Sequence, residues 1–116
     1  MDSLPFSVDL GVTTVQGVLR LEADGLAVEW RIYNLMDAPQ GDLQSIHVPY
    51  ADLEAVDYRG RLASASVTIV ARRPSAFAEF PLPAGSIATL KARVKRRHRR
   101  AAEAWCAEAG LRIAEG

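Results

Sequence analysis

The most concentrated chemistry in the sequence is cationic. The stretch RVKRRHRR, residues 93–100, places six bases in eight positions, namely Arg93, Lys95, Arg96, Arg97, Arg99 and Arg100. Lys and Arg side chains bind phosphates and anionic lipid surfaces, so this basic run predicts either a surface for an anionic partner or the solvated side of a helix. On a helix the six bases would spread over about 200°, wider than the stripe typical of a phosphate clamp. This spread favours the solvated side.

The remainder of the chain balances this charge. Residues 1–85 carry six Arg and eleven acids, whereas residues 86–116 carry eight bases and three acids, and the formal net charge of the whole chain is zero. An acidic N-terminal part followed by a basic C-terminal part indicates either an interaction surface or charge pairing between the two parts of the same chain. Both interpretations remain open from the sequence.

Metal-ligand and thiol chemistry is sparse, since the chain has two histidines, His47 and His98, and one cysteine, Cys106. His98 falls on the apolar face of a predicted helix, where a histidine hydrogen-bonded at the edge of the core is the simplest interpretation. Cys106 falls late in that helix, where the helix dipole would not lower its pKa, so we predict a packing role. These residues form no recognisable ligand pattern, and we predict neither a metal site nor a cofactor.

The sequence contains no recognisable catalytic motif. No serine lies in a nucleophile-elbow pattern, the glycines are isolated, and the carboxylates are scattered. The sequence therefore predicts a protein that is not an enzyme. A site assembled across strands around His98, with convergent carboxylates, would be the exception.

Two aromatic residues, Tyr33 and Phe77, are predicted to be exposed because they fall out of phase with the apolar positions around them. Exposed aromatic side chains near a sheet edge suit a partner interface, including self-association through an edge strand. A bulge that returns Phe77 to the core is the alternative.

The first two-thirds of the chain alternates with period two and predicts seven short strands within about residues 6–82. The segments TVQGVLRLEA and LAVEWRIY flank the turn dipeptide Asp24-Gly25 and form the clearest hairpin. Other strands are predicted at FSVDL, SIHVPY, DLEAVDYRG (with a bulge or bend), SASVTIVAR and AFAEFPL. Short strands with short connections indicate an antiparallel sheet.

A helix is predicted over about residues 86–109, because Ile87, Leu90, Val94, Ala101 and Trp105 recur at helical spacing. Ser86 would cap its N-terminus, and Gly110 would follow its end. The fold class is thus mainly β (α+β), a seven-stranded antiparallel sheet capped by one C-terminal helix.

The whole chain, residues 1–116, fits one domain. Its single cysteine predicts a reducing compartment, and neither a secretion signal nor a membrane-spanning segment is expected. We predict a cytoplasmic location.

This order of elements resembles the bacterial pleckstrin-homology-like family. The phrase IHVPYADLEAV, Ile46 to Val56, is similar to the family's segment in which a strand ends at Pro and the next opens with an acid and a Leu. FAEFPLP is similar to the family's last strand. The resemblance implies a partly open barrel plugged by the helix, with Val94 and Trp105 facing its mouth. It also implies phosphoinositide, peptide or protein ligands, and some members form rings.

The expected function is a non-catalytic binding or scaffolding module that contacts a protein partner or forms a homo-oligomer. The alternative is a peripheral binder of anionic lipid or nucleic acid that uses the basic run. The loops DLGVTT and EADG offer no base, so no specific phosphoinositide site is expected. The two functions differ in salt dependence, because phosphate contacts weaken steeply as salt rises.

Overall fold

The computed structural model describes residues 3–83 and 85–115. Seven strands, three short 3₁₀ turns and one helix follow in chain order. They are β1 (Ser3–Asp9), β2 (Thr13–Leu21), β3 (Gly25–Asn34), β4 (Pro39–Pro49), η1 (Tyr50–Asp52), β5 (Leu53–Gly60), β6 (Ser64–Ala71), η2 (Pro74–Phe77), β7 (Thr89–Lys95), η3 (Arg96–His98) and α1 (Arg99–Glu115).

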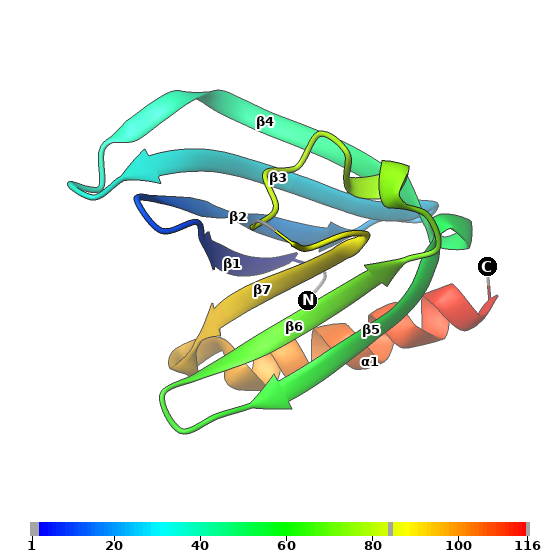
Figure 1. Ribbon diagram of the computed structural model, residues 1–116. Coiled ribbons are helices and arrows are strands. Elements are labelled where there is room, and N and C mark those ends of the chain that lie inside the picture. Colours follow the sequence, from blue (N-terminus) through cyan, green and yellow to red (C-terminus); the bar gives the residue numbers. More distant parts are fainter. Residues whose placement is uncertain (1–2, 84, 116) are drawn as a thin grey trace.

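The strands form one antiparallel sheet in the order β4-β3-β2-β1-β7-β6-β5. The order ends at β4 on one side and β5 on the other, so within the described residues the sheet is not closed. The sheet bends between β1 and β7, where the register holds the single pair Ser7–Arg93, and two layers result (Figure 1). The predicted class, a seven-stranded antiparallel sheet with one C-terminal helix, is confirmed.

The β2–β3 hairpin forms as its alternation predicts. Thr13 pairs with Asn34 at one end and Leu21 with Leu26 at the other, next to the Asp24-Gly25 turn. Most of the inward residues of both strands are buried, and Ile32 is partly buried against the core. β4 begins at Pro39, earlier than the predicted strand at Ser45, because hydrogen bonds to β3 extend the ladder through residues whose side chains are exposed.

The predicted helix over residues 86–109 is wrong in its first half, and its predicted end is also wrong, because Gly110 lies inside the helix. β7 occupies Thr89–Lys95, and the helix spans Arg99–Glu115. Leu90 and Val94 fit a helical face and a strand face equally well, but Ala92 is also buried between them. Burial at every second residue is the period of a strand. Ser86 lies in the loop before β7 and does not cap a helix.

The predicted strand at residues 76–82 is also absent. Pro74 opens the 3₁₀ turn η2, and this turn directs Phe77 into the core, where 1% of its surface is exposed. The prediction that Phe77 is exposed is therefore wrong. Phe80, in the loop that follows, packs between the layers with its ring centroid 4.8 Å from that of Trp30 and 6.1 Å from that of Phe6.

The helix α1 packs mainly against β5 and also contacts β6 and β1 (Figure 1). Trp105 is 1% exposed, and Val94 is fully buried in the same core cluster. Near the end of the helix, Arg112 donates to the carbonyl of Glu22 at 3.0 Å and to the Tyr50 hydroxyl at 3.3 Å. These bonds fix the last turns of the helix against the β2–β3 turn.

Candidate anionic-partner surface

The basic run does not lie on one helix. Arg93 and Lys95 belong to β7, Arg96 and Arg97 to η3, and Arg99 and Arg100 to the first turn of α1. The bases of β7 point to the outer face of the sheet, because the residues that alternate with them, Leu90, Ala92 and Val94, fill the core. The prediction that the run forms the solvated face of one helix is therefore wrong. The bases belong to a surface formed by β7, η3 and the start of α1.

The outer face of β7 is a column of bases flanked by hydroxyl groups. Ser66 on β6 and Ser7 on β1 pair with Arg93 from either side, and Ser64 pairs with Lys95. Directly paired residues of an antiparallel sheet share a face, so these side chains lie together. Lys91 extends the column, about 7 Å from Arg93 at the repeat of a strand. Lys91 was not among the predicted site residues, although it continues the same apolar–basic alternation.

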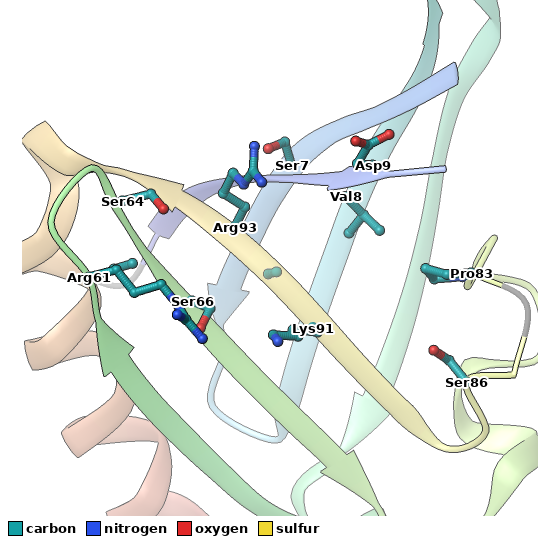
Figure 2. Close-up of a pocket in the computed structure, with 12 residues that line it drawn as sticks. Ser7, Val8, Asp9, Arg61, Ser64, Ser66, Pro83, Ser86, Lys91 and Arg93 are labelled. Atoms are coloured by element: carbon teal, nitrogen blue, oxygen red, sulfur yellow. The ribbon is translucent and has the colours of Figure 1, made fainter. Parts of the chain in front are cut away.

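A pocket of about 360 Å³ opens on this face. Figure 2 shows the side chains of Arg61, Lys91 and Arg93 around it, with Asp9 at the β1 side. The polar lining is completed by Ser7, Ser64, Ser66 and Ser86. Three bases and one acid make the pocket cationic, and the hydroxyls add hydrogen-bond donors, which suits an anionic group.

A second depression, of about 440 Å³, lies where the helix begins. Its lining consists of four arginines with one tyrosine and one acid: Arg96, Arg97, Arg99, Arg100, Tyr58 and Glu103. The guanidinium of Arg99 extends over Gly60 at the end of β5, since a Cβ added there would lie 3.1 Å from Arg99 Nη2. The start of the helix and the β5–β6 turn are thus neighbours in space.

The β5–β6 turn adds one base and one apolar side chain to this region. Arg61 and Leu62 lie in the turn, and the Leu62 side chain is 89% exposed. The Ser64–Lys95 pair brings the end of β7 beside the same turn. We call this region the basic end and define it as Leu62 with Arg61, Lys95, Arg96, Arg97, Arg99 and Arg100.

Among the residues that the structure describes, no acidic oxygen lies within ion-pair distance of the bases of the basic end, of Lys91 or of Arg93. The expectation of charge pairing between this run and an acidic sheet therefore finds no support in close contacts. Bases at a helix N-terminus are also unfavourable with respect to the helix dipole. Arg99 and Arg100 therefore oppose the dipole of the helix that they begin.

Of the remaining predicted residues, Tyr33 and Cys106 lie in other parts of the fold, whereas His98 lies beside the basic end. Tyr33 is partly buried near the end of β3. His98 lies in η3, where Arg97 Nε donates to His98 Nε2 at 3.3 Å. Cys106 is buried, and burial, with a smaller contribution from the negative charge of Asp57, raises its pKa to about 12. The thiol is therefore protonated at neutral pH and unreactive.

Comparisons with protein-family models, curated proteins and solved structures gave no match. In the part of the chain that the structure describes, no helix is both long enough and apolar enough to cross a bilayer.

Proposed function

We propose that this protein is a non-catalytic binding module that attaches to an anionic membrane surface through its basic end. One observation carries the proposal: six bases without acidic partners lie in or beside the β5–β6 turn, which also presents an apolar side chain, Leu62, that is 89% exposed. Unpaired bases attract anionic headgroups, and a projecting leucine can enter the apolar boundary beneath them.

The magnitudes support reversible attachment. Each base near an anionic leaflet contributes about 1 kcal/mol, so the six together contribute about 6 kcal/mol when all reach the surface. Full burial of a leucine side chain adds about 2 kcal/mol. The charge contribution falls as salt screens it, because the Debye length is about 8 Å at physiological ionic strength.

The proposed fold family is pleckstrin-homology-like. Seven antiparallel strands in an open, bent sheet followed by a C-terminal helix support that assignment. Recognition would depend on charge density and not on one headgroup, because the β1–β2 turn, Leu10–Val12, contains no base. We place the protein at the cytoplasmic leaflet, where anionic lipids concentrate and a single buried thiol is stable.

We assign no reaction to the module. Its cysteine is buried with a raised pKa, and the ring nitrogen Nε2 of His98 pairs with Arg97. Neither group is placed as an activated nucleophile or base.

A second candidate function, contact with a protein partner or with another copy of the chain, is favoured by an apolar tip away from the basic end. Val12 in the β1–β2 turn and Leu35 and Met36 in the β3–β4 turn are 74%, 74% and 86% exposed. The Thr13–Asn34 pair brings the two turns to the same end of the sheet. Concentration-dependent sedimentation of the wild type and of a Leu35→Ser/Met36→Ser variant tests this candidate.

Co-sedimentation with vesicles tests the membrane proposal. We expect binding to phosphatidylserine-containing vesicles and none to phosphatidylcholine vesicles. The Leu62→Ser variant, which keeps every charge, should bind the anionic vesicles more weakly. If Leu62→Ser binds as the wild type does while duplex DNA or RNA competes fully with the vesicles, the surface is a nucleic-acid site and the membrane proposal is wrong.

A further inference from the structure

Three side chains of types that bind metal ions converge at the turn of the β2–β3 hairpin. Glu22 and Asp24 flank the turn, and His47 reaches it from β4, so their ligand atoms all lie within 4.8 Å of one another. His47 Nε2 lies 3.0 Å from Asp24 Oδ1 and 3.8 Å from Glu22 Oε1. The three side chains are solvent-accessible, so an ion can reach them without a conformational change.

These separations suit a small transition-metal ion. Zn²⁺ binds imidazole nitrogen and carboxylate oxygen at about 2.0–2.2 Å, so neighbouring ligand atoms in a tetrahedral site lie about 3.3–3.6 Å apart. The two separations from His47 Nε2, 3.0 and 3.8 Å, lie on either side of that range, and all three ligand atoms lie within 4.8 Å of one another. Two carboxylates also approach a single ring nitrogen, which can satisfy only one of them well as a hydrogen-bond donor. A cation among the three would bind all of them at once.

The backbone and its neighbours hold this arrangement. Strands β3 and β4 approach closely at Gly25, where an added Cβ would lie 2.5 Å from the Val48 carbonyl oxygen and 2.9 Å from His47 Cε1, so glycine keeps the backbone of β4 and the His47 ring close to the turn. The Glu22 carbonyl accepts hydrogen bonds from the Tyr50 hydroxyl and from Arg112, which fixes the turn from behind.

The two oxygens of Glu22 have different neighbours. Arg20 Nε lies 3.7 Å from Glu22 Oε2, while Glu22 Oε1 faces His47. Such outer contacts orient a ligand toward a metal ion. The sequence did not reveal this cluster because His47 is 23 residues from Asp24, and only the β3–β4 pairing brings them together.

We propose that Glu22, Asp24 and His47 form a Zn²⁺ site with three protein ligands, its remaining coordination positions filled by water. The ion would join the β2–β3 turn to edge strand β4 and stabilise that end of the sheet. An imidazole ligand favours Zn²⁺ and other transition metals over Mg²⁺, which prefers oxygen ligands. The site does not depend on membrane binding.

The test uses the untagged chain and Zn²⁺, with Mg²⁺ as the comparison ion. Isothermal titration should show one Zn²⁺ per chain, and thermal unfolding should shift upward with Zn²⁺ but not with Mg²⁺. His47→Gln and Asp24→Asn should each weaken Zn²⁺ binding by about 100-fold or more, since even outer-shell partners contribute 10–100-fold. His98→Gln removes the other histidine and should leave binding unchanged.

Co²⁺ gives an independent readout, because its visible absorption reports direct coordination. We expect a Co²⁺ spectrum in the wild type and in His98→Gln that is lost in His47→Gln. The proposal is overturned if the wild type binds neither ion, or if His47→Gln, verified as folded by circular dichroism, retains the affinity and the spectrum of the wild type.

Discussion

The Arg99→Gln/Arg100→Gln variant separates partner binding from folding. Both side chains lie in the first turn of α1, at the basic end, and neither has an acidic partner among the described residues. Removing two charges from a surface that contacts an anionic leaflet costs about 2 kcal/mol, at about 1 kcal/mol each. Because 1.4 kcal/mol corresponds to a factor of ten, vesicle affinity should fall about 30-fold.

The same variant should not lose stability. A base in the first turn of a helix opposes the helix dipole by about 0.3–1 kcal/mol, so its removal should leave the free energy of unfolding unchanged or raise it slightly. Loss of binding together with retained stability is the combination that a functional surface predicts. A purely structural role for the two arginines predicts the reverse.

The matched control is Arg72→Gln/Arg73→Gln, which removes two adjacent arginines at the far end of β6. Arg73 Nη2 pairs with Asp52 Oδ2 at 2.9 Å on the surface, and such exposed pairs contribute about 0–1 kcal/mol. Vesicle affinity would be measured by co-sedimentation, and stability by urea unfolding. The reasoning is refuted if the two double variants lose affinity equally, or if neither loses any.

Outcomes at three further residues test the packing. Trp105→Ala should destabilise the fold by about 3–5 kcal/mol in urea unfolding, because the side chain is 1% exposed; a loss below 1 kcal/mol would contradict its place in the core. Tyr50→Phe removes the hydroxyl that donates to the Glu22 carbonyl and accepts from Arg112 of α1, and should cost about 1 kcal/mol; an unchanged midpoint would show that this hydroxyl does not help to hold the helix end. The pKa of Cys106 is raised from about 9 to about 12 in the folded state, so stability from this thiol is complete below pH 9 and lost as the pH rises toward 12. A maleimide at pH 7.5 should label Cys106 no faster than the protein unfolds, and rapid labelling would contradict its burial.

The sheet was largely predictable from the sequence because its strands alternate apolar and polar residues and its clearest turn is Asp24-Gly25. The bulge expected in DLEAVDYRG appears as the register shift between Leu53 and Ala55. The boundary between β7 and α1 was not predictable in this way, since the spacing of Leu90, Val94 and Trp105 satisfies a helix across a segment that is partly strand. Pairing with β6 and β1 decides the conformation, and that pairing is a tertiary effect.

The candidate surface was predictable only in part. The run of six bases from Arg93 to Arg100 was visible in the sequence. Its division among β7, η3 and α1 was not, because the predicted helix began before β7. Leu62 and Arg61 join them because the β5–β6 turn folds beside the end of β7, and the serines of β6 join through strand register. Such neighbours come from distant segments, and no local pattern marks them.

The salt dependence of vesicle affinity tests the central claim most directly. The dissociation constant of the wild-type protein for phosphatidylserine-containing vesicles would be measured from low to above physiological NaCl concentration. We predict that vesicle affinity falls steadily as salt rises, because screening weakens the attraction between the six bases of the basic end and the anionic headgroups. Affinity that does not change with salt, or no binding even at the lowest salt, would contradict a membrane-binding basic end.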